Sequence, residues 1–309
     1  MAKTLIVITG PTAIGKTTLA INLAQYYQTE IISADSRQFY REMEIGTAKP
    51  SPDELNVAKH HFINSHSISD FFNVGDYERE AIELIALLFK DHDILILVGG
   101  SGLYINAIVN GFDHIPSSSP MVRDKYNRLF IQEGISVLQD KLKNIDPEFY
   151  NEVDLNNPQR LIRALEVFET SGKPFSEYRT KVKKERNFNI IKIGLSSDRQ
   201  KLYENINHRV DMMINFGLIN EVEGLRSFRH LNPLNTVGYS EIFDYFDGIY
   251  TIEEAIGKIK QNTRRFAKRQ LTWFNKYEDI KWFQPDNPGI ITAYLDATLL
   301  DPELVAQKS

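Results

Sequence analysis

The sequence predicts an α/β protein in which helices cover a parallel sheet and a helical segment is inserted into the chain. Short, wholly apolar runs alternate with helical patterns in the N-terminal third, as in parallel sheets buried on both faces. The first run leads into TGPTAIGKTT (9–18), a glycine-rich turn followed by a helical pattern. The alternation stops near Gly111 and returns only with NIIKIGL (189–195), which predicts that the chain rejoins the first sheet.

Hydrophobic periodicity assigns the N-terminal elements. They are a strand over Thr4–Thr9, a helix over Thr17–Tyr27, a strand over Glu30–Ala34, a helix over Glu78–Lys90 and a strand over Ile94–Val98. Asp35 follows the second of these strands directly, and GGSG (99–102) follows the third. Both segments are therefore expected at the carboxyl edge of the sheet, where ligands bind in open α/β folds.

The inserted segment begins with a Pro/Ser linker, IPSSSP (115–120), and helical patterns follow at 121–133, 135–144 and 158–171. Asn157 is the expected N-cap of the third helix, with Pro158 at its first position and Gly172 as its stop. We therefore divide the chain into a core, 1–115 and 189–309, and a helical insertion, 116–188. Ser197 and Gln200 form a capping-box pattern that predicts another helix reaching Phe216, in a mostly helical C-terminal third.

Composition excludes several classes of protein. The 309 residues are 42% hydrophobic and 25% charged, as in an ordinary soluble globular protein. The absence of cysteine excludes disulfides, a thiolate nucleophile and a cysteine-based zinc site. Because no apolar run approaches the roughly 20 residues of a membrane helix, we expect a cytoplasmic protein without membrane contact. The net charge of −5 argues against a protein that coats nucleic acid.

The stretch Gly10–Thr17 matches G-x-x-x-x-G-K-T, the phosphate loop (P-loop) of NTPase-like cores. Its backbone N–H groups surround phosphate oxygens, Lys16 adds a positive charge, and Thr17 or Thr18 can bind Mg²⁺. The expected binding residues are Gly10, Pro11, Thr12, Ala13, Ile14, Gly15, Lys16 and Thr17. A nucleotide hydrolase also needs an acid at the end of an apolar strand to hold Mg²⁺. The strand ILILV (94–98) ends in Gly-Gly-Ser-Gly instead, so the usual ATPase interpretation lacks one part.

Asp35 is the acid expected nearest to the phosphate loop. It can serve as a general base on an incoming nucleophile, as an acid that organises a metal ion, or as a structural helix cap. Ser101, in the second glycine turn, would present a hydroxyl to the same cleft, although a purely structural turn fits that short motif equally well. For His60, His61 and His66, packing and hydrogen bonding are favoured over metal binding, because no carboxylate stands at zinc-type spacing.

Basic residues gather in two stretches of this acidic protein. Seven Lys/Arg and two acids lie between Lys173 and Lys192, and eight Lys/Arg and two acids lie between Lys258 and Lys281. Within the second stretch, TRRFAKRQLTWF (263–274) would place Arg265, Lys268 and Arg269 on one helix face. Such a face is either solvated or in contact with the phosphates of an RNA, and the pattern leaves both readings open.

The chain resembles the tRNA dimethylallyltransferases (tRNA isopentenyltransferases) of bacterial type over nearly its whole length. The matching motifs, in order, are GPTAIGKT (10–17), IISADSRQFYREMEIGTAKP (31–50), HHFI (60–63), VGGSGLYI (98–105), NNPQRLIRALEV (156–167), HRVDMM (208–213), TVGYSE (236–241) and TRRFAKRQLTWF (263–274). ADSxQxY followed by IGTAKP distinguishes this family from other phosphate-loop proteins.

This resemblance implies transfer of a dimethylallyl group from dimethylallyl diphosphate to N6 of the adenosine 3′ to the anticodon, position 37, of tRNA. The phosphate loop would then hold the prenyl diphosphate with Mg²⁺, and the partner would be the tRNA anticodon stem-loop. Asp35 would accept the N6 proton, Ser101 would contact the region of the flipped adenine, and Arg209 would help to hold the diphosphate. No zinc is expected, and we expect a monomer.

The resemblance also implies the tRNA-contacting residues. They are Asp35, Ser36, Arg37, Gln38, Ser101, Arg123, Gln159, Arg160, Leu161, Ile162 and Arg163, to which the basic face of Arg265, Lys268 and Arg269 is added. Two positions depart from the family pattern. Ser101 stands where threonine is usual, which keeps the hydroxyl, and Ile14 stands in the loop where a small residue is common.

Two other functions compete with this one. A small-molecule kinase or adenylate prenyltransferase would use the same loop and base on a nucleotide, but would need neither the insertion nor the C-terminal basic patch. A non-catalytic RNA-binding protein would not need Lys16, Thr17 and Asp35 together.

Overall fold

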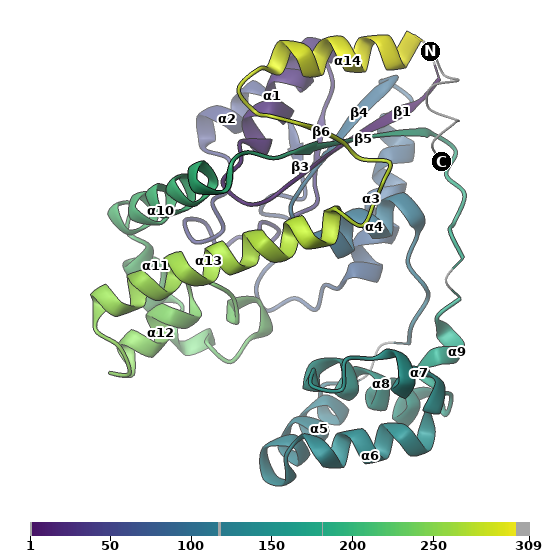
Figure 1. The fold of residues 1–309 in the computed structure, drawn as a ribbon, viewed down its shortest axis with the longest axis vertical. Helices are drawn as coiled ribbons and strands as arrows, with labels where there is room; N and C mark the ends of the chain where they lie inside the picture. Colours follow the sequence, from purple (N-terminus) through teal and green to yellow (C-terminus); the bar gives the residue numbers. More distant parts are fainter. Residues whose placement is uncertain (1, 117–118, 181, 301–309) are drawn as a thin grey trace. The chain divides into compact units, whose positions relative to one another are not determined.

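The computed structural model describes residues 2–116, 119–180 and 182–300. It divides into two compact units (Figure 1). The first, which we call the core unit, comprises Met1–Val109 and Glu185–Ser309, and the second, the insertion unit, comprises Asn110–Lys184.

The core unit is built on a six-stranded, wholly parallel sheet in the order β3-β2-β4-β1-β5-β6. The strands are β1 (Thr4–Thr9), β2 (Ile31–Ser33), β3 (His60–His61), β4 (Ile94–Val98), β5 (Asn189–Leu195) and β6 (Lys281–Phe283). The parallel sheet is confirmed, as is the return of the chain to it: β5 pairs with β1 from Thr4↔Asn189 to Thr9↔Gly194. The phosphate loop therefore follows a central strand, flanked by β4 and β5.

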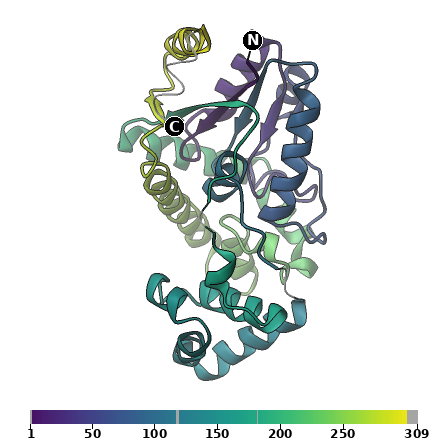
Figure 2. The same cartoon turned by 90° about the vertical axis from the view of Figure 1, so that its right-hand side faces the viewer.

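Successive residues of the strands point to opposite faces of the sheet and enter two apolar clusters. Ile6 and Ile8 belong to the cluster covered by α1 (Lys16–Tyr27), α10 (Arg199–Asn215) and α14 (Pro288–Leu300). Leu5 and Val7 belong to the cluster covered by α3 (Val74–Leu88) and α4 (Gly102–Asn110). Figure 2 shows the blue α3 and the yellow α14 on opposite sides of the sheet. Burial of both faces explains why the central strands β1 and β4, buried at every position, are so rich in apolar residues.

The remaining helices of the core unit form a third apolar cluster. Its helices are α11 (Leu218–Gly224), α12 (Ser240–Phe246) and the 23-residue α13 (Ile252–Phe274), together with the end of α10. Tyr40 and Met43, from the segment that follows Asp35, are buried in the same cluster. The short α2 (Pro52–Val57) completes the helices of this unit, with 3₁₀ turns at Arg226–Phe228 and Asn232–Leu234.

The insertion unit contains α5 (Pro120–Glu133), α6 (Ile135–Ile145), α7 (Pro147–Glu152), α8 (Pro158–Ser171) and α9 (Phe175–Tyr178) around an apolar cluster of its own. The expected ends of α8 are present: the Asn157 side chain accepts from the Arg160 N–H, and Gly172 closes the helix at φ 72°. This unit spans Asn110–Lys184 rather than 116–188. Arg186 lies outside it, because its guanidinium donates to Glu78 and to the carbonyls of Ala107 and Ile108 in the core unit.

One predicted cap is wrong. The N-cap of α10 is Asp198 and not Ser197, since the Asp198 carboxylate accepts from the backbone N–H groups of Gln200 and Lys201. A carboxylate at a helix N-terminus also interacts favourably with the helix dipole, which a serine hydroxyl does not. In the described part of the chain, no helix is long and apolar enough to span a membrane.

Candidate active site

A cavity of about 380 Å³ lies in the core unit at the carboxyl edge of the sheet. The phosphate loop, the turn after β2 and the turn after β4 meet there, because β1, β4 and β2 are neighbours in a parallel sheet. Among its lining residues are Thr12, Ala13, Ile14, Gly15, Lys16, Thr17, Thr18, Asp35, Gln38, Ala48, Lys49, Gly100, Arg209, Phe266 and Gln270. Residues far apart in the sequence thus form one site.

The phosphate loop has the backbone that its glycines permit. Gly10 has φ 139°, and a Cβ there would lie 2.6 Å from the carbonyl oxygen of Leu195 on β5. Gly15, the residue before α1, has φ 95°. Ile14, although it lines the cavity, is only 3% exposed and belongs to the apolar cluster that α1 covers. The unusual residue in the loop is therefore a core residue.

Lys16 begins α1 and is held at the loop. Its Nζ donates to the carbonyl of Pro11 at 2.7 Å. Burial and the nearby positive charge of Arg209 lower the pKa of Lys16 to about 7, while Asp35 acts in the opposite direction. An anionic ligand in the cavity would favour the charged lysine.

Asp35 follows β2 but caps no helix. Its Oδ1 accepts from the backbone N–H of Arg37 at 2.9 Å, in a turn. The carboxylate lines the cavity together with Lys16 and Arg209. A carboxylate held in this position can take a proton from a nucleophile that enters the cavity.

Ser101 lies beside the Asp35 turn. Its Oγ accepts from the backbone N–H of Ser36 at 3.0 Å and donates to Ser36 Oγ at 3.2 Å. The hydroxyl therefore connects the turn after β4 with the turn after β2. Gly99 permits this approach, because a Cβ there would lie 2.3 Å from the carbonyl oxygen of Ala34.

Helix α13 contributes two groups that sequence reasoning missed. The buried Gln270 accepts from the Thr12 N–H at 2.8 Å and donates to the Gly100 carbonyl at 2.9 Å, so one amide joins both glycine-rich turns. Trp273 lies against Gly102, where a Cβ would come within 2.2 Å of the indole Nε1. The glycines of GGSG therefore allow α13 to pack closely against this turn. The only sequence signal for these contacts was the motif TRRFAKRQLTWF itself.

A loop from Glu44 to Lys49, which we call the 44–49 loop, forms another wall of the cavity. Its Ala48 carbonyl accepts from Gln38 Nε2 at 3.2 Å and from Arg209 Nη2 at 3.4 Å. Arg209 Nη1 donates to Thr12 Oγ1, also at 3.4 Å. Burial lowers the pKa of Lys49, a further cavity residue, to about 8. Sequence reasoning missed Lys49, although IGTAKP contains it.

The expected RNA-contacting residues fall into three groups. Ser36, Arg37 and Gln38 form the turn after Asp35, and Arg265, Lys268 and Arg269 are all exposed on α13. The third group lies in the insertion unit, where α5 brings Arg123 to Gln159 and α8 carries Arg160 and Arg163. Leu161 and Ile162, also expected as contacts, are fully buried in that unit's apolar cluster, so their side chains pack rather than face solvent.

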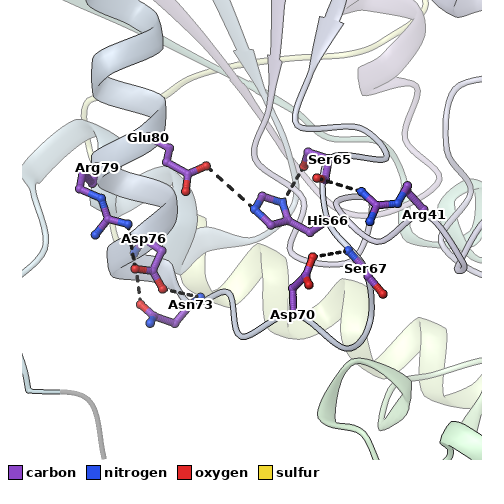
Figure 3. A network of polar contacts seen from close by, with 9 residues as sticks. All are labelled: Arg41, Ser65, His66, Ser67, Asp70, Asn73, Asp76, Arg79 and Glu80. Atoms are coloured by element: carbon purple, nitrogen blue, oxygen red, sulfur yellow. Dashed lines mark hydrogen bonds and ion pairs between the residues drawn. The ribbon is translucent and has the colours of Figure 1, made fainter.

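The histidines take part in local networks. His60 and His61 form β3, and His61 pairs with Glu30. His66 stacks on Phe72, with ring centroids 3.7 Å apart, and lies between the Ser65 hydroxyl and Glu80 (Figure 3). No group of three or more potential metal-binding side chains is present among the described residues.

Comparisons with known proteins agree with this architecture. The family model described as IPP transferase matches residues 38–277. A tRNA dimethylallyltransferase of Christiangramia forsetii is 53% identical over 97% of this chain and 99% of its own. That of Flavobacterium johnsoniae is also 53% identical, over 91% of this chain and 93% of its own.

Solved structures of related proteins have the same fold. A full-length tRNA isopentenylpyrophosphate transferase from Bacillus halodurans has a TM-score of 0.72 and 36% identity, with 99% of each chain covered. A eukaryotic dimethylallyltransferase solved acting on tRNA has a TM-score of 0.78 and 25% identity, and the likeness covers all of this chain and 81% of that one. This chain, with the phosphate loop, the Asp35 turn and the two units described above, therefore belongs to the IPP transferase family.

Proposed function

We propose that this protein is a tRNA dimethylallyltransferase that modifies N6 of adenosine 37, next to the anticodon. The observation that carries the proposal is the meeting, in one cavity, of a carboxylate base with a phosphate loop and a second cation. Dimethylallyl diphosphate is the co-substrate that this activity requires, and a tRNA carrying the adenosine is the acceptor.

The reaction needs a base because adenine N6 is a weak nucleophile with a delocalised lone pair. In the proposed reaction, N6 forms a bond to C1 of the dimethylallyl group as the bond from C1 to the diphosphate oxygen breaks. Asp35 accepts the proton that N6 loses, and diphosphate leaves with the bonding electrons. Base assistance of this kind contributes about 10²- to 10⁴-fold to a rate.

The leaving diphosphate gains negative charge, which Lys16, Arg209 and the loop N–H groups would stabilise. Mg²⁺ would assist by neutralising diphosphate oxygens. The donors present fit this ion: Thr17 and Thr18 offer hydroxyls and Asp35 a carboxylate at the cavity. Mg²⁺ usually takes only one or two carboxylates from a protein and completes its shell with substrate phosphates and water. We assign Thr17, the threonine that completes the loop motif, as the protein ligand.

The tRNA would contact both units. In the core unit, the proposed contacts are Ser36, Arg37, Gln38 and Ser101, which surround the base Asp35. The exposed cations of α13 would contact the tRNA as well. In the insertion unit, Arg123, Gln159, Arg160 and Arg163 would contact tRNA, with Leu161 and Ile162 acting through the packing of α8. The adenine must leave its stack to reach Asp35, at a cost of roughly a few kcal/mol that is lower in a partly single-stranded loop. We further propose that the enzyme is a cytoplasmic monomer.

A kinase or adenylate prenyltransferase would use the same cavity. The family of the chain and its additional basic surfaces support the tRNA enzyme, since a free nucleotide needs neither α13 cations nor an insertion unit.

Labelled dimethylallyl diphosphate tests the proposal directly. Purified enzyme should transfer label to unmodified tRNA with an adenosine at position 37, and not to AMP. A tRNA with guanosine at that position is the matched control and should remain unlabelled. Label on AMP, or equal label on both tRNAs, would reject the assigned acceptor.

A further inference from the structure

Glu221 on α11 holds the backbone of the 44–49 loop. Its Oε2 accepts from the N–H groups of Ile45 at 2.7 Å and Glu44 at 3.1 Å, and its Oε1 accepts from the N–H of Gly46 at 3.1 Å. The Tyr239 hydroxyl donates to the same Oε1 at 2.6 Å. A single carboxylate therefore receives four hydrogen bonds, three of them from consecutive residues of one loop.

Tyr239 supports this arrangement from the other side. Its side chain is fully buried, and a Cβ on Gly46 would lie 2.4 Å from the tyrosine ring. Only glycine permits that approach. The motifs TVGYSE (236–241) and IGTAKP (45–50) therefore meet at this contact.

The loop that Glu221 holds reaches the cavity at Ala48, two residues after Gly46. Ala48, at φ 47°, turns its carbonyl toward Arg209 and Gln38, and Lys49 lines the cavity. The Arg209 guanidinium donates to the Ala48 carbonyl and to the Thr12 hydroxyl, each at 3.4 Å. The position of the 44–49 loop thus fixes one of the two contacts that orient this guanidinium.

We propose that Glu221 and Tyr239 are positioning residues, which hold the 44–49 loop so that its Ala48 carbonyl orients Arg209 toward the diphosphate. Neither side chain lines the cavity, so both act through the loop and not on the substrate. The inference rests on the proposed function in assigning a diphosphate to Arg209. A merely structural brace is the opposing explanation, and it predicts changes in folding stability alone.

The first variant is Glu221→Gln, which keeps the shape of the side chain but removes its charge. The amide has one acceptor oxygen, and its NH₂ group would face a backbone N–H. Tyr239→Phe is the milder variant, because it removes one hydrogen bond and keeps the ring on Gly46. The matched controls are Glu223→Gln, which changes an exposed acid on the same helix as Glu221, and Tyr245→Phe, which changes another tyrosine.

Two measurements are made on the full chain with each variant. Steady-state kinetics gives kcat and KM for dimethylallyl diphosphate and for tRNA. Calorimetry with inorganic diphosphate and Mg²⁺ gives a Kd that is independent of prenyl transfer, so the inference can be judged even if the wild-type enzyme transfers no prenyl group to tRNA.

We expect Glu221→Gln to raise both KM for the prenyl donor and Kd for inorganic diphosphate about tenfold, and Tyr239→Phe about threefold. Both controls should match the wild type. The effect of Glu221→Gln on KM and Kd should also be non-additive with that of Arg209→Lys, because Glu221 and Arg209 act through one contact. A lower unfolding temperature with unchanged KM and Kd, or full additivity with Arg209→Lys, would overturn the proposal.

Discussion

Two glutamates, one in each unit, contact or support the proposed binding residues in different ways. Glu221 in the core unit accepts four hydrogen bonds of 2.6 to 3.1 Å, three of them from the backbone of the 44–49 loop. Glu166 in the insertion unit is fully buried and faces two guanidinium groups, Arg123 Nε at 3.6 Å and Arg163 Nη1 at 3.5 Å. Those separations are longer than a good charge-assisted hydrogen bond.

The difference indicates what each site must do. A cavity that binds a small diphosphate benefits from a rigid wall, because misplacement of a charged group by an ångström lowers the rate strongly. A surface that binds RNA phosphates needs charge in the right region, with side chains that can still adjust. Glu166 keeps Arg123 and Arg163 together while both remain partly exposed, at 47% and 33%.

Of the variants in either unit, Asp35→Asn should cause the largest loss of activity. Asparagine keeps the oxygen that accepts from the Arg37 N–H but cannot take the N6 proton, so kcat should fall about 10³-fold. Single-turnover transfer from labelled dimethylallyl diphosphate measures the rate, and filter binding measures tRNA affinity, which should stay near the wild-type value. Full activity in this variant would reject Asp35 as the base.

Replacing Arg265, Lys268 and Arg269 with glutamine should act on tRNA alone. Loss of about three phosphate contacts should weaken tRNA binding about 30-fold or more at low salt and flatten the slope of log K against log salt by about 3. Titrations at four salt concentrations give that slope. If tRNA affinity and its salt slope were unchanged, the basic face of α13 would be solvated and would not contact tRNA.

Glu166→Gln tests the comparison itself. Without the buried charge the two arginines lose their common partner, and affinity for tRNA should fall about tenfold. The KM for dimethylallyl diphosphate should not change, whereas in Glu221→Gln that KM is the quantity that rises. Glu169→Gln, a partly exposed acid on the same helix that pairs with Lys125, is the control for lost charge. Tighter tRNA binding by Glu166→Gln would show that net charge, not arrangement, governs this surface.

The pH dependence should give the smallest effect. Because the pKa of Lys16 is lowered to about 7, the free enzyme loses this charge as the pH rises through that value. The kcat/KM for dimethylallyl diphosphate should therefore fall about fourfold between pH 6 and pH 7.5. Lys16→Arg, whose guanidinium stays charged, should show no such fall over this range. A fall that persists in Lys16→Arg would assign the titration to another group.

Local patterns predicted what local physics determines. β1, β4, β5 and α8 have the bounds expected from periodicity and capping, because predominantly apolar strands and a Pro-led, Gly-ended helix are clear signals. The N-cap of α10 was misassigned where Ser197 and Asp198 are adjacent, since either residue type can cap. The phosphate loop was predicted from its motif and Asp35 from its place at the end of a predicted strand, and both line the cavity.

The supporting residues could not be found in this way. Gln270 lies 258 positions from Thr12, and Glu221 lies 176 from Ile45, so no spacing in the sequence connects them. Each is also an ordinary helix residue by composition. Their roles depend on which helices pack beside the loops, and that arrangement is a property of the folded chain alone.

The bond between Lys16 and the Pro11 carbonyl has a consequence for inhibitor chemistry. An ammonium group has three N–H donors, so Lys16 can keep its 2.7 Å bond to the Pro11 carbonyl and still donate to two diphosphate oxygens. The Pro11 bond therefore fixes the direction of the two remaining donors. Compounds that offer two anionic oxygens to Lys16 should compete with the prenyl donor more strongly than analogues that offer one.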